Sequence, residues 1–207
     1  MIDGKRAFDL ACCMIAAPVA ALLGTVIAVL VRVRSGSPVL YRGRRMGRGG
    51  TEFDILKFRT MTTATDGGGP GITSGGDPRI TPIGRWLRRT KLDELPQLVN
   101  VLRGQMSLVG PRPEDPRYAA HYRGRFAEVL NVRPGITGPA AVEFRHEEDL
   151  LRSIDPANVE RHYVESILPA KLELDLAYAR RHGVRTDLSI LAATIRAVVG
   201  RPEPDGR

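Results

Sequence analysis

The sequence has few of the residues from which metal, disulfide or base-stacking sites are built. Its two cysteines, Cys12 and Cys13, are adjacent in an apolar run, which excludes a disulfide framework and a cysteine-rich zinc site. The four histidines show neither His-x-x-His nor His-x-x-x-His spacing and do not favour a transition-metal site. Aromatic residues make up 5% of the chain, which is low for a protein that stacks single-stranded bases. The 43% apolar and 26% charged content indicates a globular chain.

Acidic residues are scarce in the first quarter of this basic chain, whose net charge is +8. Residues 1–50 hold eight Lys or Arg and two acids, and the 22 residues of 10–31 carry no charge. A helix of that length rises about 33 Å, enough for a hydrocarbon core of about 30 Å. The run exceeds the apolar region of a cleaved signal peptide, and basic residues follow it. The sequence therefore predicts a membrane element over residues 1–34.

Both flanks of the apolar run are basic. Lys5 and Arg6 precede it, and six arginines with no acid among them lie between Arg32 and Arg48. Since Lys/Arg-rich flanks stay on the cytoplasmic side, this favours a re-entrant hairpin, with a spanning helix as the alternative. Pro18 is expected to bend the helix, and Gly24 is a second candidate. The arginines predict an anionic phospholipid surface as partner rather than nucleic acid.

Residues 35–200 predict a compact cytoplasmic catalytic domain of the α+β class, mostly helical, with a small β-hairpin and interfacial amphipathic helices. The hairpin comes from strands over 38–41 and 53–59 joined by a glycine-rich turn. Residues 66–77 indicate a glycine-rich loop, either a linker or a mobile lid. Residues 155–182 are expected to be mostly helical. The apolar spacing from Leu188 to Val199 predicts an amphipathic helix, at the interface or in the core. Residues 201–207 are expected to form a disordered tail.

Two helices are predicted around residue 90. Thr81 and Pro82 are typical of an N-cap and a first helical residue, and the helix that follows is basic. A second helix is expected to start at Asp93 and to end at Gly104. Its predicted core-facing residues share a spacing of three or four: Leu95, Leu98, Val99 and Leu102.

The adjacent acids Asp93 and Glu94 follow four basic residues, Arg85 to Lys91. At a helix N-terminus, backbone N–H groups would attract a phosphate, and the carboxylates could hold Mg²⁺ together with phosphate oxygens. A carboxylate also serves as a covalent nucleophile in phosphoryl transfer. The plainer interpretation is that Asp93 only caps a helix.

Basic residues elsewhere predict phosphate binding beside the membrane element. Lys57 and Arg59 alternate on a predicted strand and are expected to project from one face. Arg112 and Arg133 stand in proline-rich turns, where a rigid guanidinium suits two-point phosphate contacts. Together these segments imply a phosphorylated substrate at the bilayer surface.

Five stretches in order resemble the monotopic phosphoglycosyl transferases among the bacterial sugar transferases. They are Lys5-Arg6-Ala7-Phe8-Asp9, Lys57-Phe58-Arg59-Thr60-Met61, Leu92-Asp93-Glu94-Leu95-Pro96-Gln97-Leu98, Ser107-Leu108-Val109-Gly110-Pro111-Arg112-Pro113 and Arg133-Pro134-Gly135-Ile136-Thr137-Gly138. The resemblance covers the chain to about residue 200.

This resemblance implies transfer of a sugar-1-phosphate from a UDP-sugar to a polyprenol phosphate such as undecaprenyl phosphate, with release of UMP. It implies ping-pong chemistry in which Asp93 carries the phosphosugar and Mg²⁺ assists, with Glu94 handling metal or proton. Residues expected around the phosphates or nucleotide are Arg88, Arg112 and Arg145. The implied place is the cytoplasmic face of the bacterial inner membrane, and a homodimer is compatible with the sequence. The alternatives are a non-catalytic basic module that docks on anionic surfaces and a membrane phosphatase with an aspartyl intermediate.

Overall fold

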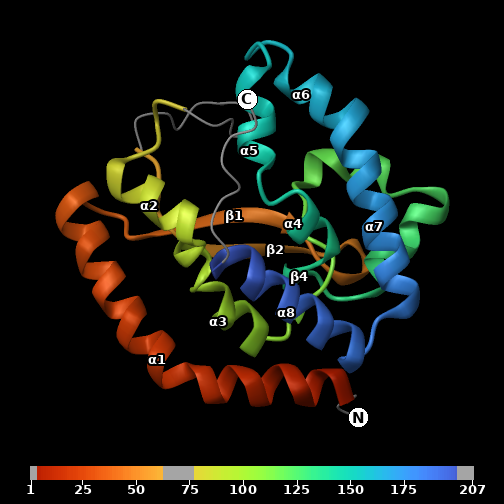
Figure 1. Ribbon diagram of the computed structural model, residues 1–207, viewed down its shortest axis with the longest axis horizontal. Coiled ribbons are helices and arrows are strands. Elements are labelled where there is room, and N and C mark those ends of the chain that lie inside the picture. The colour runs from red at the N-terminus through yellow and green to blue at the C-terminus, as the bar shows by residue number, and fades with distance from the viewer. Residues whose placement is uncertain (1–3, 63–76, 200–207) are drawn as a thin grey trace.

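The computed structural model describes residues 4–62 and 77–199 and shows two short sheets among helices (Figure 1). The described part of the chain is mostly helical with a small β-hairpin, which confirms the coarse fold class. The predicted 66–77 loop falls almost entirely outside the described residues, and the predicted 201–207 tail falls wholly outside them.

The apolar N-terminal run forms one long helix, α1 (Gly4–Ser35), with Pro18 inside it. Helical structure continues through Pro18. The helix changes direction along its length, as a bent helix was expected to do, so that two arms lie along two sides of the molecule (Figure 1). It is the one candidate membrane span among the described residues, with 11% of its most apolar window buried.

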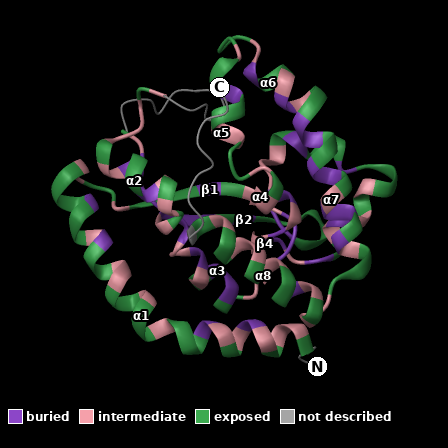
Figure 2. Ribbon diagram, viewed as in Figure 1, coloured by how far each residue is buried: buried purple, intermediate pink, exposed green. Residues whose placement is uncertain are grey.

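Both arms of α1 contact the rest of the chain. Near the start, the guanidinium group of Arg6 donates to the carbonyl oxygens of Val101 (2.7 Å) and Leu102 (3.2 Å). In the second arm, Ile27 and Val31 are buried in an apolar cluster with Phe58. Most of the outward side chains of α1 are exposed, as Figure 2 shows along both arms. The helix is therefore fastened at both ends and uncovered along its outer face.

The predicted hairpin is confirmed by strands β1 (Leu40–Met46) and β2 (Glu52–Phe58), which pair antiparallel with Tyr41 opposite Lys57. A one-turn 3₁₀ helix, η1 (Arg48–Gly50), joins them. Gly49 and Gly50 have φ of 69° and 74°, the left-handed region that glycine adopts without strain. The first strand runs five residues beyond the predicted stretch. Its two buried residues, Gly43 and Met46, stand among arginines, and a search for apolar alternation overlooks them.

Helix α2 (Pro82–Thr90) begins as predicted, with the Thr81 hydroxyl accepting from the N–H of Gly84 at 3.0 Å. Gly84 lies against the Thr60 backbone, where a Cβ atom would overlap the carbonyl group. The second predicted helix is different. A 3₁₀ turn, η2 (Leu92–Glu94), precedes α3 (Gln97–Leu102), so Asp93 is not the N-cap of an α-helix. Gly104, with φ of 80°, does follow the end of α3.

The predicted apolar stripe is half right. Leu95 and Leu98 pack against apolar clusters, whereas Val99 and Leu102 are about 40% exposed. The buried residues of α3 are Gln97, Asn100 and Val101. Asn100 is inside because its side chain bonds the backbone of β2: Oδ1 accepts from Leu56 N (3.0 Å) and Nδ2 donates to Asp54 O (2.8 Å).

A second sheet, which the sequence did not predict, joins two short parallel strands, β3 (Ser107–Val109) and β4 (Gly135–Thr137). The turns after these strands lie backbone against backbone. A Cβ atom at Gly138 would overlap the carbonyl oxygen of Gly110. This close approach fixes the turn that presents Arg112.

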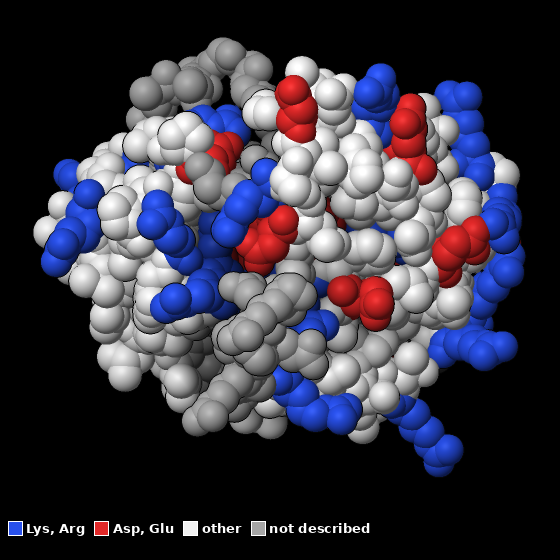
Figure 3. All heavy atoms as spheres, turned by 45° about the horizontal axis from the view of Figure 1, so that its top comes forward, with Lys and Arg blue, Asp and Glu red and all other residues white. Residues whose placement is uncertain are grey.

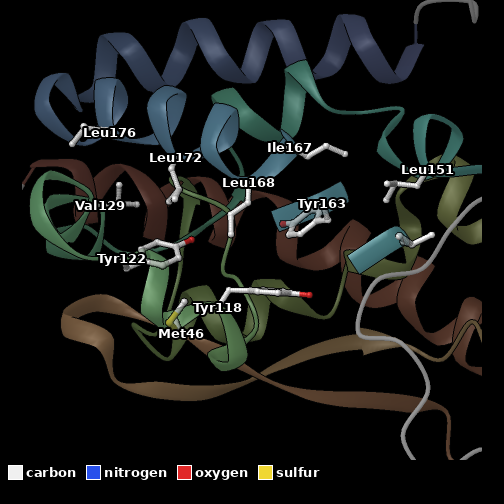
Figure 4. Close-up of a cluster of buried hydrophobic side chains, with 11 residues drawn as sticks. Met46, Tyr118, Tyr122, Val129, Leu151, Tyr163, Ile167, Leu168, Leu172 and Leu176 are labelled. Carbon is white, nitrogen blue, oxygen red and sulfur yellow. The ribbon is translucent and has the colours of Figure 1, made fainter. Parts of the chain in front are cut away.

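The C-terminal half is helical, as predicted for residues 155–182. Its elements are η3 (Pro116–His121), η4 (Gly124–Asn131), α4 (Pro139–Glu143), α5 (Glu147–Leu150), η5 (Leu151–Ser153), α6 (Val159–His162), a π-helical turn η6 (Tyr163–Ile167), α7 (Leu168–Arg181) and α8 (Val184–Val199). The main apolar core joins α7 and η6 to η3, η4 and the end of β1 (Figure 4). On α8, Leu188, Ile195 and Val198 are at least half exposed, so the core alternative is wrong for these residues.

Candidate active site

The turn that carries Asp93 is oriented by the apolar residues beside it. Helix α2 ends at Lys91, which has φ of 57°, and this left-handed residue redirects the chain into η2. Leu92 and Leu95 then pack against the cluster that includes Ile27 of α1. Asp93 and Glu94 are consequently buried on the inner side of the turn, 6% and 8% exposed. The turn that holds the two adjacent carboxylates thus packs on the second arm of α1 through its leucines.

Two cations hold the carboxylate of Glu94. Lys57 Nζ, near the end of β2, lies 2.7 Å from Oε1, and the Arg112 guanidinium lies 2.8 Å from the same oxygen. Burial alone would raise the pKa of Glu94, but the charges of Arg112 and Lys57 outweigh it and hold the pKa far below its usual range. Burial lowers the pKa of Lys57 and Glu94 opposes this change. Glu94 is therefore the fixed anion of the pair.

Asp93 is the less constrained carboxylate. Its Oδ1 atom is buried without a hydrogen-bond partner among the described residues. Burial raises the pKa of Asp93, and the positive charges of Lys57, Arg88 and Lys91 oppose this rise while Glu94 adds to it. A buried carboxylate oxygen that lacks a partner is costly, and such groups gather where a ligand or reacting group completes the site.

Arg88 links helix α2 to the short helix α5. Its Nε donates to Thr60 Oγ1 at 3.0 Å, and a terminal nitrogen lies 2.7 Å from Glu148 Oε1. Thr60 follows β2, whose residue Lys57 holds Glu94, so both basic residues are positioned from one short stretch of chain. In Figure 3, Lys and Arg side chains lie over much of the face shown, with Asp and Glu side chains among them.

Three predicted phosphate-binding residues lie elsewhere. Arg59 follows the last residue of β2, so strand alternation does not extend to it, and its guanidinium bonds the carbonyl oxygens of Ser35 and Ser37 at the end of α1. Arg133 Nε donates to Gly104 O at 3.0 Å. Arg145 is exposed and makes no ion pair with the described residues. The structure thus brings together Lys57, Arg88, Asp93, Glu94 and Arg112, and a phosphate role for the other three stays a prediction.

Sequence reasoning missed a buried polar network behind Arg112. Lys171 of α7 lies 2.9 Å from Glu114 and 3.0 Å from Glu147, and the Tyr163 hydroxyl donates to Glu114 at 2.7 Å. The negative charges of Glu94, Glu147 and Glu114 all raise the pKa of Arg112. Glu114 directly follows the proline-rich turn that holds Arg112, so its place near Arg112 could have been predicted from the sequence. Lys171 lies far along the chain, and no sequence pattern indicated its contact with Glu114.

The donor set suits a divalent cation only in part. Among the described residues, no group of three or more His, Cys, Asp and Glu could hold a metal ion. Asp93 offers a free carboxylate oxygen, whereas one Glu94 oxygen is engaged by two cations. Mg²⁺ is commonly bound by one or two carboxylates with substrate phosphates and water. The site therefore fits a cation that arrives with a phosphate.

A buried acid beside a second acid that is fixed by two cations is an arrangement that phosphoryl transfer can use. Comparison with known proteins shows the family. The chain belongs to the bacterial sugar transferase family, whose model matches residues 2–201.

Several curated relatives carry specific names. The chain is 38% identical over 199 residues to an undecaprenyl-phosphate glucose phosphotransferase of Komagataeibacter xylinus, a match covering 93% of this chain and 35% of that protein. It is 33% identical to a UDP-N-acetylgalactosamine-undecaprenyl-phosphate N-acetylgalactosaminephosphotransferase of Aeromonas hydrophila, over 94% of this chain and 43% of that protein. It is 35% identical to the uncharacterized sugar transferase EpsL of Bacillus subtilis, over 94% and 87%. The chain thus spans well under half the length of the first two.

Proposed function

We propose that this chain transfers a sugar-1-phosphate from a UDP-sugar to a polyprenol phosphate such as undecaprenyl phosphate. The products are the polyprenyl-diphosphate sugar and UMP, and the reaction is the first membrane step of a glycoconjugate or polysaccharide pathway. The observation that carries the proposal is the buried Asp93 carboxylate, which has an oxygen without a hydrogen-bond partner in the described part of the chain, beside the fixed Glu94. The names of the relatives support the substrate classes.

The proposed chemistry proceeds in two displacements at phosphorus. A carboxylate oxygen of Asp93 attacks the phosphorus bonded to the sugar, and the bond to the bridging oxygen breaks as UMP leaves with the electron pair. An oxygen of the polyprenol phosphate then attacks the same phosphorus, and the Asp93 carboxylate is released. Atoms and charge balance without any redox partner. The covalent intermediate divides one difficult transfer into two easier steps.

The residues around Asp93 have distinct proposed roles. Arg88 and Arg112 face the phosphate oxygens, where directional and permanently charged guanidinium groups stabilise the charge that develops in transfer. The positive charge of Lys57 opposes the burial-driven rise in the pKa of Asp93 and so favours the ionised form that attacks. Mg²⁺ would be held by Asp93 and the free oxygen of Glu94, and when bound it neutralises phosphate charge.

The membrane arrangement follows from the exposed apolar side chains. Met14, Ile15, Val19 and Leu22 of α1 are at least 66% exposed, which is unfavourable in water. Both ends of the helix contact the same body of the protein. A re-entrant α1 at the cytoplasmic face of the bacterial inner membrane satisfies both facts, with the juxtamembrane arginines on anionic phospholipid. The exposed apolar residues of α3 and α8 are proposed to lie at the same interface.

The test is UMP release by the purified chain with undecaprenyl phosphate, Mg²⁺ and a panel of UDP-sugars. The wild type should release UMP with at least one donor, and Asp93→Asn should lose at least about a thousand-fold of that rate, because it removes the nucleophile. Asp54→Asn, an exposed carboxylate of β2, is the matched control and should retain full activity.

Other outcomes separate the alternatives. Phosphosugar passed to water instead of lipid would favour the membrane phosphatase. Equal rates in the wild type and Asp93→Asn would contradict the proposal, and a chain that binds anionic vesicles with every donor unreacted would favour the docking module.

A further inference from the structure

Strand β3 leads directly into the turn that presents Arg112. Only Gly110 and Pro111 separate its last residue, Val109, from Arg112, whose guanidinium holds Glu94 at 2.8 Å. The strand has three residues and pairs with a single neighbour, β4. A strand this short has little pairing of its own to fix its position. Whatever else fixes β3 therefore also fixes Arg112.

The first turns of α1 bond the backbone and side chains of β3. Asp9 is 1% exposed, and its Oδ2 accepts from the Ser107 hydroxyl at 2.8 Å while its Oδ1 accepts from Leu108 N at 3.2 Å. One helical turn earlier, Lys5 Nζ donates to the carbonyl oxygen of Val109 at 3.0 Å. All three residues of β3 are thus bonded by two side chains of the membrane helix.

The Val109 carbonyl oxygen lies within a buried polar group. The Tyr178 hydroxyl of α7 lies 3.0 Å from this oxygen and 2.7 Å from Asp187 Oδ1 of α8. Lys5 pairs with the other oxygen of Asp187. Asp187 is 0% exposed and Tyr178 is 3% exposed. The ammonium group of Lys5 can donate to both acceptors, whereas the single hydroxyl hydrogen of Tyr178 serves one of them at a time.

The free energy lost by burying these charged groups argues that the first turns of α1 do more than attach the protein to a membrane. Burying the carboxylates of Asp9 and Asp187 loses their hydration, which their partners must offset. A basic flank that only met lipid headgroups would leave Lys5 in water. Instead its ammonium group reaches the strand beside the active site. We call Lys5, Asp9, Tyr178 and Asp187 the β3 clasp.

We propose that the β3 clasp positions Arg112, so that Lys5 and Asp9 of the membrane helix are positioning residues for the transfer reaction. This inference rests on the proposed function and adds to it. It predicts that the first turns of α1 are needed for turnover as well as for membrane attachment.

The test uses two variants of the full chain in lipid nanodiscs. Tyr178→Phe removes one hydroxyl and keeps the ring, and Lys5→Gln is too short to reach both of its partners. Each should lower kcat for UMP release about ten-fold, because small displacements of a phosphate-binding group are costly in transfer. Vesicle partition should stay within two-fold of the wild type. Arg185→Gln, an exposed site on α8 with the same charge change as Lys5→Gln, should keep both properties.

A double-mutant cycle identifies the residue through which the clasp acts. The cycle uses an Arg112→Lys background, which retains a shorter cation. In that background Tyr178→Phe and Lys5→Gln should each lower kcat less than two-fold. Any decrease that either variant causes in the unfolding temperature should be the same in both backgrounds. A full ten-fold loss in that background, or wild-type kcat in the single variants, would overturn the positioning role. A loss of vesicle partition that matches the loss of rate would overturn it in favour of anchoring. An inactive wild type would instead count against the proposed function.

Discussion

At the scale of residues, the two neighbouring carboxylates of the site have different contacts. Glu94 is held between Lys57 and Arg112, whereas no residue that the structure describes bonds Oδ1 of Asp93. Such a division gives one acid a fixed role and leaves the other free to react. The fixed acid in turn depends on Arg112, which is supported from behind by residues of α7.

Among the residues of α7 that lie behind Arg112, Asp175 is a buried acid with a raised pKa. It is 3% exposed, and its Oδ1 has no partner among the described residues. Burial raises the pKa of Asp175 to about 7, although the positive charge of Lys171 opposes the rise. The groups that face it from the surrounding elements are the acid Glu114, the hydroxyls of Tyr122 and Tyr178, and the backbone N–H groups of Arg112 and Ala140.

This raised pKa predicts a pH dependence of stability. The folded chain holds a proton on Asp175 between an unfolded pKa near 4 and the folded value of about 7. Stability from this group is therefore complete below pH 4 and is lost as pH rises to 7, by up to about 1.4 kcal/mol per pH unit. Asp175→Asn cannot titrate, and its unfolding free energy should fall less steeply between pH 5 and 7. Parallel pH curves for the two proteins in denaturant titrations would contradict this assignment.

At the scale of elements, local patterns predicted where helices begin better than which faces are buried. The Thr81 cap and the basic helix after it were predictable, because capping is local. The buried face of α3 was not, since Asn100 is inside to bond β2, a partner 44 residues away. The parallel pairing of β3 with β4 was missed for the same reason: no local spacing shows it. Asp93 and Glu94 were found because they are adjacent, but their division of roles depends on distant cations.

Helix α1 is the element whose arrangement matters most for function. The re-entrant proposal predicts that cysteines at Gly4 and Arg34, with Cys12 and Cys13 replaced by alanine, lie on one side of the membrane. A membrane-impermeant maleimide should label both in inverted vesicles and neither in spheroplasts, because both basic flanks stay on the cytoplasmic side. Labelling of one site from each side would replace the re-entrant arrangement with a spanning helix.

At the scale of the whole molecule, the turn that carries Asp93 and helix α1 form one unit. The turn of Asp93 packs on the second arm of α1 through Leu92 and Leu95, and the first arm bonds β3. The proposed acceptor is confined to the bilayer surface and the proposed donor arrives from water. If Asp93 is the proposed nucleophile and α1 the proposed membrane element, this packing lets each substrate react without leaving its own phase.

The central claim is that Asp93 carries the phosphosugar between the two substrates. It is tested most directly by intact mass and peptide mass spectrometry of the chain after brief reaction with a UDP-sugar and Mg²⁺ in the absence of polyprenol phosphate. The account predicts the added mass of one sugar phosphate on the peptide that contains Asp93, lost on addition of undecaprenyl phosphate and absent in Asp93→Asn. An unmodified peptide at a time when the same preparation turns over, or the added mass on a different residue, would contradict it.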